Sequence, residues 1–530
     1  MNGGSTGFER QVDKAGSNGS AYSRRILTFL IWLWGGGLAA TALAVAVLGA
    51  THWLYWFWGN QAGGGDQLNY AVYLAHGENY FTRPDTYPML TPDMPGLFSL
   101  LLVPWVYAFG PKLLYGNILG ALSLAVTLAA AATAVRTCSK RTISIPLAWG
   151  LLLSMRRIGD GYAYNRPDSL AGALVAVSLV CLLRNEAKWA AARSNSIYLT
   201  VGAVTAVLAI FSKQTALAMI AGTCVYFVMT KAVRELIRYI GASLLLGIPI
   251  VLIAQRLTGG GYLYNLVTIV GAMPEYSLAH WLRTNGLFIL GNIGTLFLAG
   301  VGAYGLIRRG IRRNPLSSLT VVTCVLTIFV VGTCWHEGAG LNHFLFALFG
   351  LAVTGGIAAA DWFSNPSRSQ RAVYSCFLLL TVGQVALNHL TPWRALKEMW
   401  PAPWSLGRPD LRKAERLFER TRRLEGEVLF DRLSGMAVLQ GRRVEVEPAS
   451  LAILKERKVW NPKVFLADLN RRRWRYIVAT SLYSDSPLVF FGDAELDAAF
   501  KHGYQCSEEF PLDIAPHVAP SAHLCRARSD

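Results

Sequence analysis

The sequence has few charged residues for its length. Only 15% of its 530 residues are Asp, Glu, Lys or Arg, whereas 53% are hydrophobic, and the mean hydropathy is +0.34. Soluble globular proteins carry about 25% charged residues and a smaller apolar share, so this composition excludes a soluble multidomain protein. The sequence predicts a polytopic membrane protein.

Acidic residues are scarcer than basic ones. The chain has 32 Asp and Glu against 50 Lys and Arg, which gives a net charge of +18. In nucleic-acid-binding proteins such a charge gathers on one folded face. Here the basic residues form short clusters between apolar runs, such as 308–313, as in the cytoplasmic loops of membrane proteins. We therefore expect membrane lipids, and no nucleic acid, among the partners.

Cysteine is also scarce, with 8 residues in the chain. Five lie in or beside apolar segments, where a thiol behaves as a small buried hydrophobic group: Cys181, Cys224, Cys324, Cys334 and Cys376. Only Cys506 and Cys525 lie together in a polar region. They would form a disulfide in an extracytoplasmic compartment, but two free thiols are an equally good interpretation.

Long apolar runs follow a polar N-terminal segment. Residues 1–25 are rich in Gly and Ser and predict a disordered cytoplasmic tail. The apolar run 26–50 exceeds the roughly 7–15 residues of a signal-peptide core, so we expect an uncleaved first span. Basic clusters orient about eleven spans, with the N-terminus inside and the C-terminus outside. The predicted spans are 26–50, 113–135, 143–155, 169–183, 197–211, 215–230, 239–254, 284–307, 316–335, 343–360 and 372–390.

The polar stretch 63–95, after the first span, holds an isolated carboxylate in front of a helix-like run. Asp66 begins this run and Tyr70 follows one turn later. An ionisable group at the mouth of a membrane bundle is costly unless it faces water or a partner, so Asp66 is a functional candidate. The next apolar piece, 96–110, is short for a span and is expected to lie near the outer surface.

The predicted topology places isolated polar groups from distant segments at one outer face. Their mixed charges suit a site that binds an anion and transfers a proton. These groups are Asp66, Arg156, Arg157, Asp160, Arg166, Asp168, Lys213, Glu275, His336, Glu337 and His343. Glu78, Asp85, Asp93 and Asp160 are interpreted as solvated loop acids.

The composition changes after the membrane part, 26–390. Prolines punctuate a linker, and short apolar strands then alternate with helical patterns in 391–530, which predicts a small α/β domain on the same side as Asp66. The expected strands are 427–431, 436–440, 442–447, 476–480 and 487–492, and the expected helices include 449–458 and 493–502.

Several motifs resemble those of GT-C fold glycosyltransferases that use polyprenyl-phosphate sugars. This group includes protein mannosyltransferases, aminoarabinose transferases of lipid A and mycobacterial arabinofuranosyltransferases. The motifs are Asp66 with the run from Tyr70 to Tyr80, Tyr87-Pro88 to Pro95, Arg166-Pro167-Asp168, Phe211-Ser212-Lys213-Gln214-Thr215, Gly340-Leu341-Asn342-His343, and residues 447–460 and 471–480. The resemblance implies the GT-C fold for the membrane part and an extracytoplasmic C-terminal domain, in a bacterial inner membrane.

The resemblance also implies an activity, the transfer of a sugar from a polyprenyl-phosphate donor to a lipid or glycan acceptor hydroxyl, usually with inversion. This step needs a base near the acceptor oxygen and positive groups near the leaving phosphate. Asp66 is the expected base. The alternative is that Asp66 caps the helix that follows it.

Lys213 and Arg166 are the candidates for holding the donor phosphate, with Tyr70 and His343 as further donor-binding candidates. Each has a structural alternative: a side chain at the end of a span that reaches the surface for Lys213, an ion pair with Asp168 for Arg166, and a helix-capping or interfacial role for His343. Asp168 is a donor-site candidate that could instead bind Mg²⁺ or Mn²⁺ together with Asp66, although such hard cations require several oxygen ligands.

Other membrane functions remain open from the sequence. A transporter or flippase is expected to show internal repeats and helices broken at mid-membrane, and the sequence shows no such repeat. A lipid-linked glycan ligase or polymerase is expected to have a large late outer loop, whereas the longest polar outer loop predicted here is the first. A structural assembly protein is the third alternative.

Overall fold

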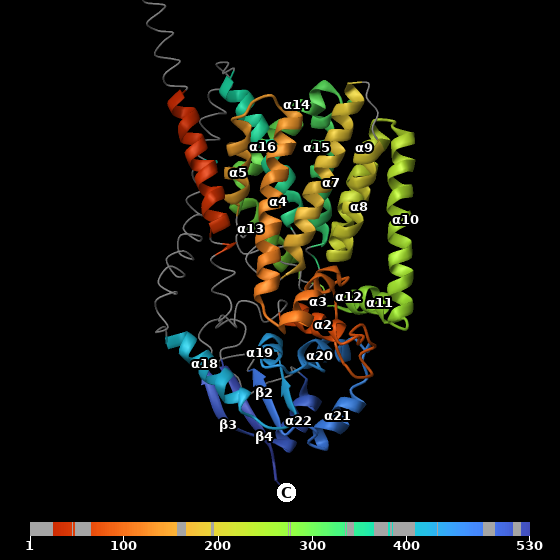
Figure 1. Ribbon diagram of the computed structural model, residues 1–530, viewed down its shortest axis with the longest axis vertical. Helices are drawn as coiled ribbons and strands as arrows, with labels where there is room; N and C mark the ends of the chain where they lie inside the picture. Colours follow the sequence, from red (N-terminus) through yellow and green to blue (C-terminus); the bar gives the residue numbers. More distant parts are fainter. Residues whose placement is uncertain are drawn as a thin grey trace, which may run out of the picture.

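The computed structural model shows a helical bundle at one end of the molecule and a small α/β domain at the other (Figure 1). The two parts predicted from the sequence are therefore present. The structure describes residues 25–44, 46–47, 65–155, 166–191, 196–273, 275, 277–333, 335, 344–364, 380–381, 384, 409–431, 433–480, 493–511 and 521–529. Arg156, Arg157, Asp160, His336, Glu337 and His343 lie outside these residues, as does the predicted strand 487–492.

The bundle contains helices of two lengths. Five described helices are long and apolar enough to cross a membrane: Arg25–Ala44, α4 (Leu114–Cys138), α7 (Pro167–Ala190), α10 (Val233–Leu257) and α15 (Pro315–Thr333). The shorter or bent ones are α5 (Ser144–Leu153), α8 (Ser196–Ser212), α9 (Leu217–Met229), α13 (Leu278–Gly291), α14 (Ile293–Arg309) and α16 (Leu345–Ser364). The total of about eleven spans stays a prediction.

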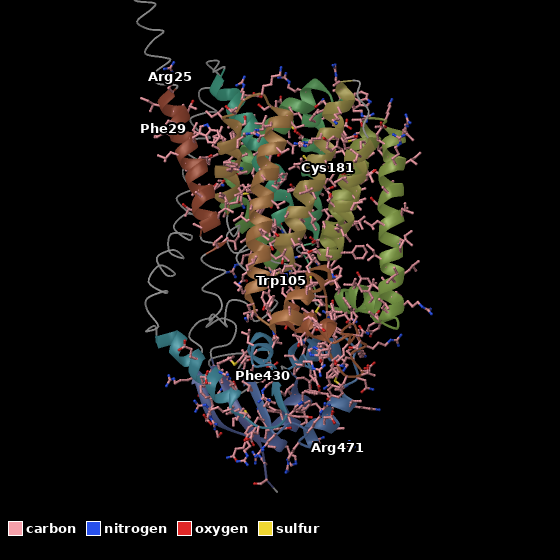
Figure 2. All side chains as sticks on the ribbon, viewed as in Figure 1. Arg25, Phe29, Trp105, Cys181, Phe430 and Arg471 are labelled. Atoms are coloured by element: carbon pink, nitrogen blue, oxygen red, sulfur yellow. A yellow bond between two sulfur atoms is a disulfide. The ribbon has the colours of Figure 1, made fainter. Side chains whose placement is uncertain are left out.

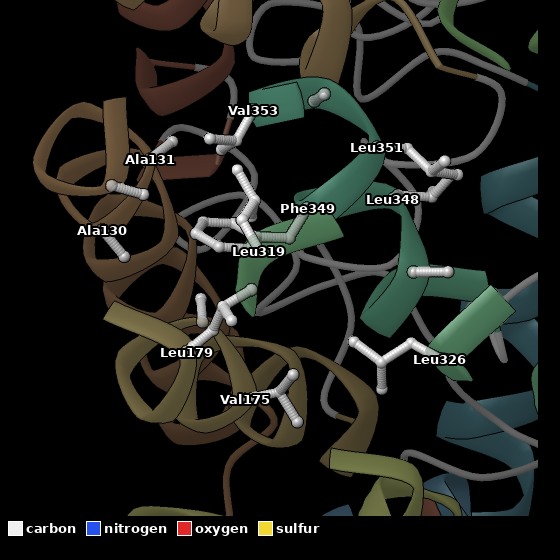
Figure 3. Packing of buried hydrophobic residues seen from close by; sticks show 14 of the residues in the cluster. Ala130, Ala131, Val175, Leu179, Leu319, Leu326, Leu348, Phe349, Leu351 and Val353 are labelled. Carbon is white, nitrogen blue, oxygen red and sulfur yellow. The ribbon is translucent and has the colours of Figure 1, made fainter. Parts of the chain in front are cut away.

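The bundle core is built from close packing of apolar and small residues. Leu179 of α7, Leu319 of α15 and Phe349 of α16 belong to one buried cluster (Figure 3). Within a membrane, helices associate through close contact and not through exclusion of water, which favours small residues where helices meet. Gly356 is such a site, because a Cβ atom there would lie 2.8 Å from the backbone nitrogen of Ala148.

The single span predicted at 284–307 is wrong. Helices α13 and α14 instead meet at an angle of 81°. Asn292 ends α13 and its Nδ2 donates to the carbonyl of Phe288 at 2.8 Å. The broken backbone needs a new partner, and the buried Gln384 Oε1 accepts the Thr295 N–H at 3.0 Å. Sequence hydropathy does not register such a bend, because both arms are apolar.

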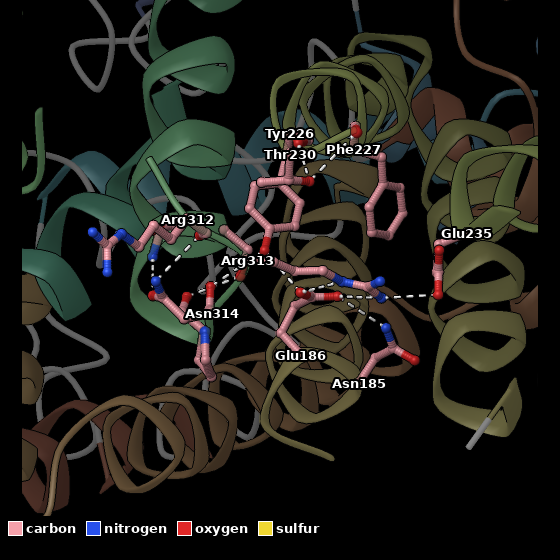
Figure 4. A network of polar contacts seen from close by, with 12 residues as sticks. Asn185, Glu186, Tyr226, Phe227, Thr230, Glu235, Arg312, Arg313 and Asn314 are labelled. Atoms are coloured by element: carbon pink, nitrogen blue, oxygen red, sulfur yellow. Dashed lines mark hydrogen bonds and ion pairs between the residues drawn. The ribbon is translucent and has the colours of Figure 1, made fainter. Parts of the chain in front are cut away.

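A polar network closes the end of the bundle that lies away from the α/β domain (Figure 4). The fully buried Glu186 at the end of α7 accepts from Arg313 Nε at 3.1 Å and from the Tyr226 hydroxyl at 2.8 Å. Arg313 also pairs with Glu235 of α10 at 3.0 Å. Glu186 and Arg313 together therefore tie α7, α9, α10 and the α14–α15 connection.

The first loop lies between the bundle and the α/β domain. It holds α2 (Asp66–Ala75), an irregular segment and α3 (Leu97–Phe109), which matches the short helix predicted at 96–110. Trp105 of α3 is 53% exposed at this end of the bundle (Figure 2). Three short helical pieces that follow α10 pack beside the loop: α11 (Gly261–Leu263), η3 (Tyr264–Ile269) and α12 (Val270–Ala272).

The C-terminal domain has a four-stranded sheet in the order β1-β2-β4-β3. Strands β1 and β2 are parallel, whereas β4 is antiparallel to both of its neighbours. Its elements are α18 (Pro409–Arg422), β1 (Val428–Phe430), α19 (Ser434–Leu439), α20 (Pro448–Glu456), α21 (Lys463–Asn470), β2 (Tyr476–Thr480), α22 (Ala494–Gly503), β3 (Tyr504–Pro511) and β4 (Ser521–Ala527). Cys506 and Cys525, which are opposed on β3 and β4, form a disulfide.

The predicted strands 427–431 and 476–480 are confirmed as β1 and β2, and the helices predicted at 449–458 and 493–502 correspond to α20 and α22. The strand predicted at 436–440 is wrong, because these residues belong to α19 and the turn after it. A short apolar run buried on all sides does not distinguish a helix from a strand. The strand predicted at 442–447 is also wrong apart from one bridge, in which Val446 pairs in parallel with Met89 of the first loop.

Candidate active site

Asp66 is the first residue of α2 and is half-buried at the junction of the bundle and the C-terminal domain. Gly65 occupies the N-cap position, so Asp66 is not the N-cap residue of α2. The Asp66 carboxylate instead accepts a hydrogen bond from Ser434 of α19. A residue of the C-terminal domain therefore contacts the predicted base.

Two glycines allow this contact. A Cβ atom on Gly65 would lie 2.3 Å from the backbone nitrogen of Gly435 and 2.6 Å from Ser434 Oγ. Any larger residue at Gly65 would push the start of α2 away from the start of α19. The close approach of the two backbones therefore fixes the position of Asp66 against the C-terminal domain.

Glu447, the residue before α20, points its carboxylate into the first loop. Its Oε1 accepts from the Tyr70 hydroxyl at 3.0 Å, and its Oε2 accepts from the Thr91 N–H at 2.9 Å and from Thr91 Oγ1 at 2.5 Å. Tyr70, a predicted donor-binding residue, is thus buried and engaged with Glu447. Burial and the negative charge of Glu447 raise the pKa of the Tyr70 hydroxyl well above its usual value, so Tyr70 stays a neutral donor.

The environment of Asp66 suits a base. Burial, followed by the negative charge of Glu447, raises the pKa of Asp66 to about 8, with a further increase from Asp93. The hydrogen bond from Ser434 and the positive charge of Arg166 lower this pKa but do not reverse the shift. A carboxyl group whose pKa lies near the working pH accepts a proton far more readily than an ordinary aspartate.

Lys213 and Asp168 form a buried ion pair. Their side chains are 2% and 3% exposed, and Lys213 Nζ donates to Asp168 Oδ1. Asp168 lies in the first turn of α7, and Lys213 precedes η2 (Gln214–Ala216). Lys213 is therefore a partner of Asp168, a pairing that was not expected from the sequence. Lys213 does not extend to the surface, which removes the alternative first considered for it.

Arg166 and Asp93 lie in the same electrostatic neighbourhood. Arg166 is half-buried immediately before α7, and its charge acts on both Asp66 and Asp93. Asp93 is exposed to solvent, yet the surrounding protein displaces enough water to raise the pKa of its carboxyl group. The charges of Lys213 and Arg166 oppose this increase. Asp93 is thus solvent-exposed, as expected from the sequence, and its charge also acts on the pKa of Asp66.

The loop acids Glu78 and Asp85 have structural partners. Glu78 forms an ion pair with Arg443, and Asp85 Oδ1 accepts the N–H of Asn461 at 3.2 Å. Both contacts join the first loop to the C-terminal domain. They are anchors of the loop.

The structure thus brings together five residues singled out from the sequence: Asp66, Tyr70, Arg166, Asp168 and Lys213. The sequence analysis missed the roles of Glu447, Ser434 and Asp93. Glu447 lies in a segment already noted for its resemblance to the family, but its contact with residues more than 350 positions away carries no local signal.

The metal site predicted at Asp66 and Asp168 stays a prediction. Asp168 already neutralises Lys213, and among the residues that the structure describes no three His, Cys, Asp or Glu side chains are grouped so as to hold a metal ion. A hard divalent cation requires several oxygen ligands, which these two carboxylates do not supply.

Two solved structures share this architecture. ArnT from Cupriavidus metallidurans in the apo state is 12% identical, with a TM-score of 0.53, over 84% of this chain and 93% of ArnT. The oligosaccharyltransferase AglB from Archaeoglobus fulgidus is 11% identical, with a TM-score of 0.50, over 85% of this chain and 70% of AglB. No protein-family model and no curated protein matches the sequence. At these identities the similarity concerns the fold alone: the chain shares the fold of ArnT and AglB, which is the GT-C fold expected from the sequence.

Proposed function

We propose that this protein transfers a sugar from a polyprenyl-phosphate donor to an acceptor hydroxyl at the extracytoplasmic face of a bacterial inner membrane, with inversion at the anomeric carbon. The observation that carries the proposal is the half-buried Asp66, whose pKa is raised to about 8 beside the cationic Arg166. The arrangement supplies a base and a positive charge in the same neighbourhood, which are the two groups that this reaction needs.

In the proposed step, Asp66 takes the proton of the acceptor hydroxyl while the acceptor oxygen attacks the anomeric carbon. The bond from that carbon to the phosphate oxygen breaks on the opposite face, and the polyprenyl phosphate leaves with the electron pair. Arg166 stabilises the negative charge that builds on this phosphate. No step in this proposal is assigned to a divalent cation.

Lys213 was expected to hold the donor phosphate, but in this proposal its main role is structural. Its charge is compensated by Asp168 in the structure, so direct contact with the donor phosphate requires this ion pair to open. While the pair is closed, it fixes the start of α7 and hence the backbone of Arg166. Arg166 is therefore the preferred phosphate ligand.

The similarity to AglB supports a lipid-phosphate donor. The solved AglB complex contains an inhibitory peptide and a dolichol-phosphate, so a protein of this fold accommodates a polyprenyl phosphate. The acceptor in our proposal is the hydroxyl of a lipid or glycan in the cell envelope.

Two features support an extracytoplasmic location for the site. The Cys506–Cys525 disulfide in the C-terminal domain suits an oxidising compartment. The basic cluster around Arg312 and Arg313 lies at the other end of the bundle, as expected for cytoplasmic loops (Figures 1 and 4).

The proposal is tested with the full-length protein in lipid nanodiscs, a panel of radiolabelled polyprenyl-phosphate sugars and an envelope lipid extract as acceptor. The expected result is release of unlabelled polyprenyl phosphate together with a labelled product of opposite anomeric configuration. Absence of sugar transfer across a panel of common sugars would reject it. Movement of intact donor between leaflets, without loss of its sugar, would instead favour a flippase. The broken helix pair α13–α14 is also compatible with that alternative, because transporters often contain broken helices.

A further inference from the structure

Glu447 belongs to the C-terminal domain, but its carboxylate is held by the first loop. Three donors from two residues of that loop, Tyr70 and Thr91, converge on its two oxygens at 2.5 to 3.0 Å. A carboxylate removed from water is costly unless such donors replace the lost hydration. These contacts place Glu447 in one position relative to α2.

The segment before Glu447 binds the same helix. Asn69 Nδ2 donates to the carbonyl of Val444 at 3.0 Å, and the N–H of Val444 donates to Asn69 Oδ1 at 3.1 Å. Asn69 and Tyr70 lie three and four residues after Asp66, so all three side chains share one face of α2. The segment 444–447 therefore docks on the face that carries the proposed base.

We propose that Glu447 is a positioning residue of the transfer reaction: it holds Tyr70 and Thr91 so that α2 presents Asp66 at a fixed place, and the active centre is assembled from both parts of the chain. This inference rests on the proposed function, because it concerns the same site. The C-terminal domain is then a component of the catalytic centre.

The charged and titratable groups around this contact come from several elements. Glu447, Asp93 and Arg166 act on Asp66, and Ser434 donates to it. Asp66 and Glu447 interact electrostatically and both are negative when ionised, so the two carboxylates then repel each other. A Gln side chain at 447 avoids this repulsion and keeps all three contacts, with its Oε1 accepting from Thr91 and its Nε2 donating to the Tyr70 oxygen.

The contact is tested with Glu447→Ala, Glu447→Gln and a matched interface control, Trp460→Phe. Trp460 Nε1 donates to the carbonyl of Pro84 at 2.9 Å, so this control removes one hydrogen bond of the same interface away from Asp66. All variants are studied as the full chain in nanodiscs. Backbone amide exchange in α2 reports the docking, and kcat and donor KM are measured at high pH, where Asp66 is ionised in every variant.

We expect Glu447→Ala to increase exchange in α2 by at least about tenfold, because three hydrogen bonds are lost. Its kcat should fall about 100-fold with donor KM changed less than about threefold, as for a misplaced catalytic group. Glu447→Gln should retain both the exchange rates in α2 and kcat within about threefold, and Trp460→Phe should retain kcat. Wild-type exchange and wild-type kcat in Glu447→Ala would overturn the inference.

Failure of the proposed function gives a different pattern. If the wild-type protein transfers no sugar, the proposed function and the catalytic role of Glu447 are both rejected. The amide exchange measurements in α2 still show whether Glu447 holds this helix in place. If Glu447→Ala does not fold, Glu447→Gln decides the question. Increased exchange in α2 with an unchanged kcat in this variant would contradict the inference, because the docking of α2 would then not affect catalysis.

Discussion

Lys213 is buried against Asp168, and the two residues join the start of α7 to the corner between α8 and η2. Ser212 strengthens this junction, since its hydroxyl donates to the carbonyl of Pro167 at 3.0 Å. The ion pair lies beside the proposed site, because both of its charges act on the pKa of Asp93. It therefore links the stability of the bundle to the position of the site.

Removing one member of this pair should strongly destabilise the protein. Lys213→Met or Asp168→Asn is expected to cost about 3–5 kcal/mol, because one buried charge is left without its partner. The double variant should recover most of this loss. Thermal unfolding in detergent measures the effect, with Glu419→Gln as a control that disrupts the exposed Arg422–Glu419 pair and should change stability by less than about 1 kcal/mol. Single variants as stable as the control would contradict the role of the pair.

The activity should rise with pH. Asp66 must be deprotonated to accept a proton, so kcat/KM is expected to increase through a midpoint near the pKa of about 8. Glu447→Gln removes a negative charge that raises this pKa, so the midpoint should move to lower pH. A pH–rate profile of both proteins checks this, and a midpoint near 4 in the wild type, or an upward shift in the variant, is incompatible with the proposed environment.

The same shift has a consequence for stability. Because the folded state raises the pKa of Asp66 from 3.8 to about 8, folded Asp66 binds a proton over a range in which unfolded Asp66 has lost it. This group therefore makes folding less favourable as pH rises from about 4 to about 8. Asp66→Asn should flatten that part of the dependence of thermal stability on pH, and an unchanged slope would show that Asp66 has an ordinary pKa.

The approach of α2 to α19 should tolerate no side chain at residue 65. Gly65→Ala places a Cβ atom 2.3 Å from the backbone nitrogen of Gly435, so the two helix starts must separate. We expect at least about a tenfold loss of transfer, since a small displacement of a catalytic group is costly. Gly241→Ala in α10 is the control, because a Cβ atom there meets nothing within 4 Å. Equal activity of the two variants would argue against a fixed start of α2.

The prediction from sequence succeeded where the signal is local. Asp66 and Tyr70 follow the first apolar run at helical spacing, and β1 and β2 are short strands with clear boundaries. The 81° break at Asn292 was missed, because its stabilising partner Gln384 lies about 90 residues further along the chain. Glu447 was missed for the same reason, since its partners Tyr70 and Thr91 belong to the first loop.

The location of the charges could be predicted only in part. The sequence placed Arg166, Asp168 and Lys213 at one face, because basic clusters oriented the spans between them. It did not predict that Lys213 pairs with Asp168, since the choice between two nearby cations depends on how α7 packs on α8. Residue types and topology thus predict the neighbourhood of a site, whereas packing decides its pairs.

The central claim is that Asp66 is the base of sugar transfer. The most direct measurement is the single-turnover rate of Asp66→Asn with a polyprenyl-phosphate sugar, compared with Asp85→Asn, which alters an acid of the same loop that contacts Asn461. The account predicts a loss of at least about 100-fold for Asp66→Asn, as is usual when a general base is removed, and a rate within about threefold of wild type for Asp85→Asn. A wild-type rate in Asp66→Asn would contradict it.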